Sequence, residues 1–382
     1  MGSWTLLEAA AWSAAGLWFV VLLLPWLPWW PGPRLEVAGA PKEAPCLDGI
    51  TVLIPARDEA AGLPAVLQAL RAQGQGLRVV VIDDDSSDDT AEVARRLLGG
   101  EGCVLRGAVK PPGWSGKLWA LEQGRRLVET PWILLLDADI VLRPGLLDAA
   151  YRKARAEGLD LLSLMATPRQ VGFWERLLMP AFVYFFKLLY PFRISNSRWA
   201  GMAAAAGGFV LLRAGLLECI GGFGALRGAL IDDCTLARLC KRHGARTWVG
   251  LSRDVRSLRR ADALAAIRDM VARTAFTQLG YSRTWLGLCT VLMVLAFVVP
   301  LAGLWDPRAA VPGTLAWASM SLSYLPTVVY YGRSPLWALL LPAIGILYLW
   351  MTWVSALRHW RGQGAGWRGR HYARPDAARR SG

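Results

Sequence analysis

The chain has 382 residues, of which 54% are hydrophobic and only 19% are charged, and its mean hydropathy is +0.32. This composition argues against an ordinary soluble enzyme. Twenty Trp and a formal charge of +14 are typical of a membrane protein with interfacial aromatic residues and basic cytoplasmic loops. Nucleic-acid binding is disfavoured despite the charge, because no basic helix or aromatic nucleic-acid motif is present.

The N-terminus begins with an apolar segment, which we expect to be a membrane anchor within residues 1–32. Residues 9–30 contain no charged side chain, and a membrane-spanning helix needs about 20 such residues. Only Glu8 precedes the segment, whereas Arg34 and Lys42 follow it. The positive-inside rule therefore places the N-terminus outside and the domain predicted at residues 46–280 in the cytoplasm.

Residues 46–280 begin with alternating strand and helix patterns. Short apolar runs predict strands, and longer amphipathic runs predict helices. Strands that alternate with helices imply a parallel sheet built from right-handed βαβ units. The predicted strands are 50–55, 77–82 and 132–136, and the predicted helices are 60–73, 88–98 and 117–129.

Polar residues follow the first two predicted strands, at the edge where open α/β sheets bind ligands. Pro55 ends the first strand, and Arg57 and Glu59 follow it as candidate contacts to a phosphate and a nucleoside. Asp83 and Asp84 open a cluster of five Asp in seven residues. Some of these Asp can cap the next helix, but adjacent carboxylates at a strand end favour a ligand or a cation.

Two further motifs complete the first half of this domain. Lys117 ends a Gly-Trp-Ser-Gly-Lys loop that opens a helix and could neutralise phosphate, although the loop lacks P-loop spacing. Asp137 and Asp139 follow the strand 132–136, and we expect them on opposite sides of an extended backbone. Two such carboxylates suit Mg²⁺ or Mn²⁺ bridging a diphosphate.

Residues 173–192 are strongly aromatic, with Arg176 and Lys187 eleven residues apart. This spacing puts the two cations on nearly one helical face and favours a helix in the membrane interface. The alternative is a buried core helix kinked at Pro180.

Asp232 and Asp233 follow a glycine-rich stretch and open a helix predicted at 233–243. Either could serve as a general base, or the pair could simply favour the N-terminus of that helix.

The end of the chain combines cations with apolar segments. A basic run precedes residues 284–357 and could contact lipid headgroups or a leaving diphosphate; it comprises Arg253, Arg256, Arg259, Arg260, Arg268 and Arg273. The charge-free windows 284–305, 309–332 and 334–357 predict three further spans. Three spans would leave the tail at 358–382, with seven Arg and one Asp, outside. Because the positive-inside rule places a basic tail in the cytoplasm, one segment could be re-entrant or interfacial.

The Cys and His residues give no sign of a metal site or a catalytic triad. The six Cys form no C-x-x-C pair and match no zinc spacing, which favours reduced structural thiols. Three His disfavour a histidine-based triad or metal site.

These motifs, in this order, resemble the inverting family 2 glycosyltransferases with a GT-A fold, over about Ile50 to Arg273. The resemblance implies a Rossmann-like α/β domain and a UDP-sugar donor. It further implies that Asp83 faces the uracil base, that Asp137-Ala138-Asp139 is the metal-binding D-x-D, and that Asp233 is the base. Thr235 departs from the family's E-D-x-D, and the segment around Arg273 lacks the Gln or Arg and the Trp of processive synthases, which argues for a single sugar transfer.

Within the family, the anchor, the segment Gly113–Trp119, Ile231-Asp232-Asp233-Cys234 and Ala272–Gln278 are similar to the hopanoid-associated subgroup. That similarity implies a multi-pass protein of the bacterial inner membrane with a lipid acceptor, such as a hopanoid. Three rivals stay open: a polyprenyl-phosphate sugar synthase, a non-catalytic membrane scaffold that binds nucleotide or lipid, and a transporter. The four apolar segments carry no charges that could form a transport path, which disfavours the last.

Overall fold

The computed structural model describes residues 4–39, 43–100, 102–229 and 231–363, with the backbone of β9 (Gly366–Trp367) and β10 (Arg370–His371). Within these residues the chain divides into two compact units, each made of interleaved segments. One unit comprises 1–31, 170–193 and 261–366, and the other comprises 32–169, 194–260 and 367–382. We call them the helical unit and the sheet unit.

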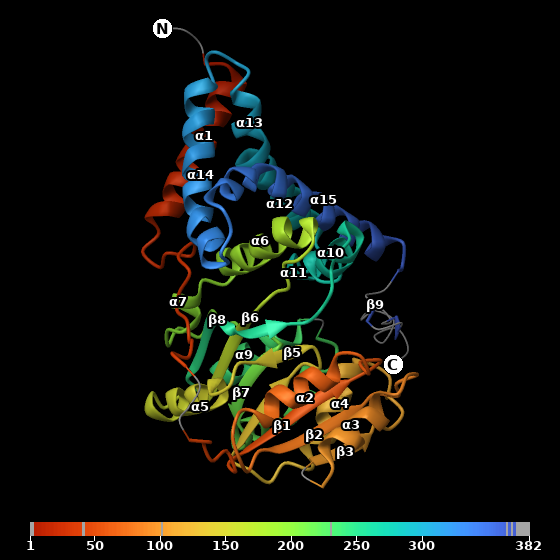
Figure 1. Ribbon diagram of the computed structural model, residues 1–382. Helices are drawn as coiled ribbons and strands as arrows, with labels where there is room; N and C mark the ends of the chain where they lie inside the picture. The colour runs from red at the N-terminus through yellow and green to blue at the C-terminus, as the bar shows by residue number, and fades with distance from the viewer. Residues whose placement is uncertain are drawn as a thin grey trace. The chain divides into compact units, whose positions relative to one another are not determined.

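The sheet unit is built on an eight-stranded mixed sheet in the order β3-β2-β1-β4-β7-β6-β8-β5 (Figure 1). β1, β2, β3 and β4 are parallel neighbours, whereas β7 runs antiparallel to both β4 and β6. β5 pairs antiparallel with the far end of β8. The strands are β1 (Ile50–Ala56), β2 (Arg78–Asp83), β3 (Gly102–Arg106), β4 (Trp132–Leu136), β5 (Ile140–Leu142), β6 (Leu161–Thr167), β7 (Phe209–Arg213) and β8 (Thr247–Ser257).

The central strands are buried along their whole length, as their continuous apolar runs predict. Val52 and Ile54 join one hydrophobic cluster, while Leu53 between them joins another, so successive side chains of β1 face opposite sides of the sheet. The surrounding helices are α2 (Leu63–Arg71), α3 (Thr90–Leu98), α4 (Gly116–Arg125), α5 (Leu146–Ala156), α8 (Ala214–Cys219), α9 (Asp232–Arg242) and the 3₁₀ turn η1 (Gly222–Leu226). The predicted strands and helices of this region, and the α/β class, are confirmed.

The helical unit contains helices throughout its described residues. They are α1 (Leu6–Leu23), α6 (Phe173–Leu189), α10 (Leu264–Ala272), α11 (Ala275–Gln278), α12 (Arg283–Met293), the π-helical turn η2 (Val294–Val298), α13 (Val299–Gly303), α14 (Ala310–Tyr330), the 3₁₀ segment η3 (Pro335–Leu340) and α15 (Leu341–Trp360). A short helix, α7 (Phe192–Ser195), lies where the chain returns to the sheet unit. Three segments are long and apolar enough to cross a membrane: Leu6–Leu23, Arg283–Gly303 and Pro335–Trp360.

Two local predictions for these regions are wrong. Arg176 is exposed, whereas Lys187 is buried and donates to the carbonyl oxygen of Trp30, so the two cations do not form one polar stripe on α6. The backbone between Asp137 and Asp139 is a turn, because the amide of Ile140 donates to the Asp137 carbonyl at 3.1 Å, and it is not extended as predicted.

Candidate active site

The ends of three neighbouring parallel strands bring the first acidic motifs to one edge of the sheet. β1 lies between β2 and β4, and Ala56 at its end pairs with Asp83. Asp83 and Asp84 are buried there, with only 5% and 3% of their surface exposed. Asp137 directly follows β4, and its amide donates to the Gly208 carbonyl at 3.2 Å, which ties it to the chain entering β7.

Several carboxylates of the first cluster serve the backbone. The Asp58 carboxylate accepts from the amide and hydroxyl of Ser87, at 2.7 and 3.0 Å, and the hydrogen bond from this amide is the main reason that the pKa of Asp58 is lowered. Asp88 accepts from the amides of Ala60 and Thr90, at 3.1 and 3.0 Å. These bonds join the loops after β1 and β2, so part of the acidic cluster is structural. Among them, the bond from Thr90 is the one that reaches the start of α3, whose N-cap residue Asp89 makes no side-chain cap hydrogen bond.

Arg57 leaves a donor available at this edge. Its Nη1 donates to the carbonyl oxygen of Asp84 at 2.6 Å, which fixes the guanidinium beside the buried carboxylates. Its Nε is buried and lies 3.9 Å from Asp58 Oδ2, an ion pair too long for a hydrogen bond, and it has no hydrogen-bond partner in the described structure. A buried donor without a partner is costly, so an acceptor atom of a ligand would complete this position.

Lys117 lies among the carboxylates of the second motif. It follows Ser115, whose side chain caps α4 by accepting from the Leu118 amide at 3.2 Å. The Lys117 Nζ is 2.6 Å from Asp137 Oδ1. Burial alone would lower the pKa of Lys117, but the carboxylates of Asp137, Asp232 and Asp233 together raise it above its ordinary value.

A close backbone approach at Gly207 connects Lys117 with Asp233. The Gly207 amide donates to Asp233 Oδ2 at 2.8 Å, and its carbonyl oxygen is 3.4 Å from Lys117 Nζ. A Cβ at this position would lie 3.3 Å from both side chains, tighter than most Cβ contacts. A side chain at this position would therefore push the lysine and the carboxylate slightly away from the backbone.

Asp233 is held as an acceptor at the start of α9. Its Oδ1 also accepts from the Cys234 amide at 2.7 Å. Burial, and next the charge of Asp232, raise the pKa of Asp233 to about 6, although Lys117 acts in the opposite direction. A carboxylate with such a pKa is mostly ionised at neutral pH and is a stronger base than an ordinary Asp.

The carboxylates of Asp137 and Asp139 suit a divalent cation. Burial, and next the charge of Asp137, raise the pKa of Asp139, so a bound cation would stabilise the ionised form. The described residues contain no group of three His, Cys, Asp or Glu that could hold a metal. Mg²⁺ and Mn²⁺ sites often use one or two carboxylates and complete the shell with substrate phosphates and water, so this donor set fits the predicted ion.

Arg259 joins the site, although the sequence grouped it with a general basic run. The antiparallel pairing of β5 with β8 ends beside the metal motif, where the Leu258 amide donates to the Asp139 carbonyl at 2.8 Å. The Arg259 guanidinium is exposed, and its charge acts to lower the pKa of Asp139. The sequence carries no signal for this pairing, because β5 and β8 are more than a hundred residues apart.

The other predicted residues are placed as follows. Pro55 lies within β1, and Glu59 is half-buried near the second motif, because a Cβ at Gly62 would contact both the Glu59 carboxylate and the Ala138 carbonyl. Arg273 ends α10 in the helical unit, so its contact with the donor stays a prediction.

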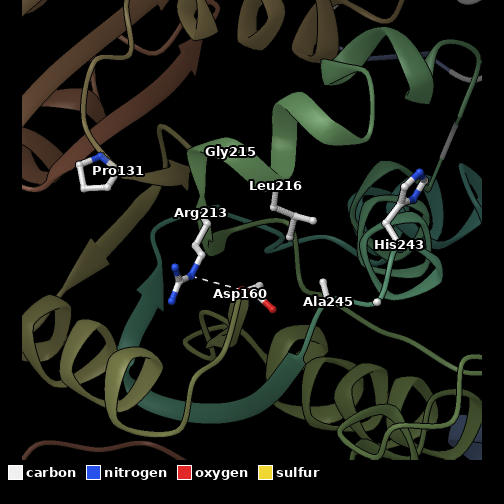
Figure 2. A pocket seen from close by; sticks show the side chains of 8 residues that line it. Pro131, Asp160, Arg213, Gly215, Leu216, His243 and Ala245 are labelled. Carbon is white, nitrogen blue, oxygen red and sulfur yellow. Dashed lines mark ion pairs between the residues drawn. The ribbon is translucent and has the colours of Figure 1, made fainter.

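A surface pocket of about 500 Å³ lies at the other edge of the sheet (Figure 2). Its residues include Pro131 before β4, the ion pair of Asp160 with Arg213 at 3.2 Å, and His243. They lie at the starts of β4, β6 and β8, whereas the acidic motifs follow the ends of β1, β2 and β4. The pocket is therefore separate from the acidic site.

Comparisons with known proteins identify the family and the fold of the chain. The family model described as "Glycosyltransferase like family 2" matches residues 48–277. A 4,4'-diaponeurosporenoate glycosyltransferase of Staphylococcus haemolyticus is 34% identical over 101 residues, 26% of this chain and 27% of the relative. An undecaprenyl-phosphate 4-deoxy-4-formamido-L-arabinose transferase of Pseudomonas paraeruginosa is 27% identical over 134 residues, 34% of this chain and 39% of the relative.

The matched segments thus span less than half the length of these two relatives. Among solved structures, a mannosyltransferase of Pyrobaculum calidifontis, in complex with GDP-Man and Mn²⁺, has a TM-score of 0.55 at 20% identity. The match covers 92% of this chain and 99% of that one, and it shows the GT-A Rossmann-like fold. Because the family model matches more than half of the chain, the protein belongs to glycosyltransferase family 2.

Proposed function

We propose that the chain transfers one sugar from a nucleotide-sugar, a UDP-sugar by preference, to a hydroxyl group of a membrane lipid, with inversion at the anomeric carbon. The observation that carries this proposal is the arrangement of Lys117, Asp137 and Asp233 around Gly207. It puts a cation for a diphosphate beside a carboxylate of raised pKa, the two groups that such a displacement needs.

The donor would bind across the carboxyl edge of the sheet. Asp83 and Glu59 would contact the nucleoside, and the Nε of Arg57 would donate to one of its acceptors or to phosphate. Lys117 would exchange part of its contact with Asp137 for a phosphate oxygen, since an ammonium on a flexible stem can move between anions. Asp84 would support the edge through its backbone bonds with Arg57 and Ala56.

Asp137 and Asp139 would hold Mg²⁺ or Mn²⁺, which would neutralise charge on the leaving diphosphate. Arg259, exposed beside Asp139, would donate to the same diphosphate. These cations would therefore act on the bond that breaks, between the anomeric carbon and the phosphate oxygen.

Asp233 would take the proton of the acceptor hydroxyl as its oxygen attacks the anomeric carbon. Each carboxylate oxygen already accepts one backbone hydrogen bond and keeps a free lone pair. These two bonds fix the orientation of the carboxylate, and Asp232 strengthens the base by raising its pKa.

The acceptor class rests on the named relatives and on the apolar helices. One relative is named as a 4,4'-diaponeurosporenoate glycosyltransferase and another as an undecaprenyl-phosphate 4-deoxy-4-formamido-L-arabinose transferase. The second name specifies a polyprenyl acceptor, and this chain carries three helices suited to a membrane. A hopanoid hydroxyl at the cytoplasmic face of the bacterial inner membrane is the acceptor that we propose.

A polyprenyl-phosphate acceptor is the second candidate, because one relative bears that activity in its name. A phosphate oxygen is already a nucleophile and needs no strong base. Asp233→Asn would then reduce transfer only mildly.

The proposal is tested with detergent-solubilised protein, radiolabelled nucleotide-sugars, Mg²⁺ or Mn²⁺, and a total lipid extract of the source cell. We expect a labelled lipid that disappears with EDTA and with Asp139→Ala. Asp160→Asn, at the opposite edge of the sheet, is the matched control and should keep the activity. If no donor labels any lipid while UDP still binds, the scaffold alternative replaces the transferase.

A further inference from the structure

The segment of η3 and α15 is long and apolar enough to cross a membrane, but its beginning and its end attach to the same layer of helices. At the beginning, Arg333 Nε donates to Gln170 Oε1 at 3.1 Å, three residues before α6 starts. At the end, Arg358 Nη2 donates to Asp269 Oδ1 in α10 at 2.6 Å. A segment that crosses a bilayer should instead have its ends on opposite sides.

α6 and α10 belong to one layer. The buried Glu175 of α6 accepts from the amide of Ala261, just before α10, at 2.9 Å. Leu177 and Leu178 of α6 share a hydrophobic cluster with Ile267 of α10. The ends of the 335–360 segment are therefore fixed to neighbouring helices of the same unit.

The middle of the 335–360 segment runs away from the layer of α6 and α10 along α14, and α15 then returns to that layer. After α14 ends, η3 runs back along it until the Trp317 indole, in the first half of α14, donates to the Leu339 carbonyl at 3.0 Å. α15 then returns toward the layer, where the Tyr348 hydroxyl donates to the Leu178 carbonyl of α6 at 2.9 Å. Near its end, the Ser355 hydroxyl donates to the Ala272 carbonyl of α10 at 2.5 Å.

α1 and α14 differ from this segment, because their contacts with the α6 region lie in the second half of the helix or after its end. The Tyr184 hydroxyl of α6 is 2.7 Å from the Ser323 hydroxyl, in the second half of α14. Lys187 of α6 donates to the Trp30 carbonyl after α1, and Arg333 follows α14. The two helices pack along each other, and both begin at the end of the unit that lies away from α6 (Figure 1). α12, η2 and α13 lead to that far end, where Pro300 and Gly303 meet Gly313 of α14.

α15 also carries an exposed apolar stripe. Its members recur at intervals of four and three residues, which places them on one helical face; they are Ile346, Trp350, Trp353, Leu357 and Trp360. The opposite face packs inside the unit through Ile344, Tyr348 and Met351. An apolar face with three Trp suits the interfacial region of a bilayer.

We propose that residues 335–360 form a re-entrant segment that enters and leaves the membrane on the face where the sheet unit is connected, so that α14 makes the last crossing. The exposed stripe of α15 would contact lipid acyl chains of that leaflet. The segments that cross would then be α1, Arg283–Gly303 and α14. α14 has 21 residues and no charged side chain, although it is less apolar than the three segments named under the overall fold.

The charges agree with this topology. The loop between α13 and α14 contains one Asp and one Arg, so it has no net charge. In this topology, the membrane face where the sheet unit is connected carries Arg333 and the basic tail, which begins with Arg358 and Arg361. With three crossings the tail lies on the side of the sheet unit, which satisfies the positive-inside rule that four crossings would violate.

Cysteine labelling in intact membranes tests the topology. The full chain keeps exposed Cys103 of the sheet unit as the reference, with the other native Cys replaced by Ala. Single cysteines at the exposed positions of Arg308→Cys, Ser334→Cys and Gln363→Cys are then labelled with a membrane-impermeant maleimide in right-side-out and inverted vesicles.

We expect positions 334 and 363 to be labelled from the same side as Cys103, and position 308 from the opposite side. If positions 363 and 308 were labelled from the same side, α15 would cross the membrane. If positions 334 and 308 were labelled from the same side, α14 would not cross it. Either result overturns the proposal.

A second measurement tests what covers the stripe. A nitroxide at Trp353→Cys in nanodiscs should collide with oxygen, which dissolves in lipid, and not with a water-soluble nickel complex. Collision with nickel would place the stripe in water, and collision with neither would mean that protein, such as a second copy of the chain, covers it. Both of these results contradict contact with lipid.

Discussion

The two acidic regions of the sheet unit look alike in sequence but differ in what balances their charge. Asp58 and Asp88 accept hydrogen bonds from backbone amides and serine or threonine hydroxyls, which belong to the fold, and Asp58 also lies 3.9 Å from the Arg57 Nε. Asp137 and Asp233 share one ammonium group, that of Lys117, although Asp233 also accepts from the amides of Gly207 and Cys234. A ligand can displace a lysine side chain far more easily than a backbone amide. The density of carboxylates therefore says less about function than the groups that neutralise them.

The largest expected effect is that of Asp233→Asn, which removes the base from the second region. General acid–base catalysis contributes about 10²- to 10⁴-fold, so kcat for a hydroxyl acceptor should fall in that range with little change in donor binding. Steady-state transfer rates and a UDP-binding isotherm measure the two quantities. Asp160→Asn, which also loses one charge and accepts from a backbone amide, is the control.

Lys117→Met should come next, because it leaves Asp137, Asp232 and Asp233 without their common cation. We expect about a hundredfold loss of kcat/KM, since hydrogen bonds to charged groups contribute about 1.5–3 kcal/mol each. Isothermal titration with UDP should show weaker donor binding. Lys153→Met removes a lysine that pairs with Glu157 on the surface of α5 and should have no effect; equal losses in both variants would contradict the assignment.

Arg259→Ala should have a smaller effect, because its guanidinium is exposed and screened by solvent. About a tenfold loss of kcat/KM is expected if it donates to the leaving diphosphate. Arg256→Ala, three residues earlier on β8, is the matched control, since Arg256 donates to the Arg253 carbonyl. If Arg259→Ala weakened membrane binding without lowering turnover, Arg259 would contact lipid headgroups and not the leaving diphosphate.

Asp88→Ala should affect the fold and barely the chemistry. Removing a side chain that accepts from two backbone amides costs about 1 kcal/mol, which should appear as a lower melting temperature in detergent. The transfer rate of the folded protein should stay near that of the wild type. A large loss of kcat at an unchanged melting temperature would show that the two acidic regions do not differ as described.

Local patterns in the sequence predicted much of this site. The apolar runs before Asp83 and Asp137 placed both at strand ends, because buried parallel strands leave a strong hydrophobic signal. Ser115 marks the start of α4, so the position of Lys117 on a helix followed as well.

The contacts between distant segments could not be predicted. Arg259 reaches Asp139 through the pairing of β5 with β8, and Gly207 approaches Lys117 through the return of the chain into β7. The burial of Lys187 also depends on Trp30, far away in sequence. Such contacts arise from tertiary packing, which leaves no periodic trace in a single sequence.

The most direct test of the central claim, that Asp233 is a base tuned by its neighbours, is the pH profile of single-turnover transfer. The base must be ionised, so the wild-type rate should fall as the pH drops through about 6. Asp232→Asn should move this midpoint to lower pH, because it removes the neighbouring charge that raises the pKa, and Lys117→Met should move it upward. A wild-type rate that stays constant between about pH 5 and 8, where ordinary carboxylates are already ionised, would contradict the account.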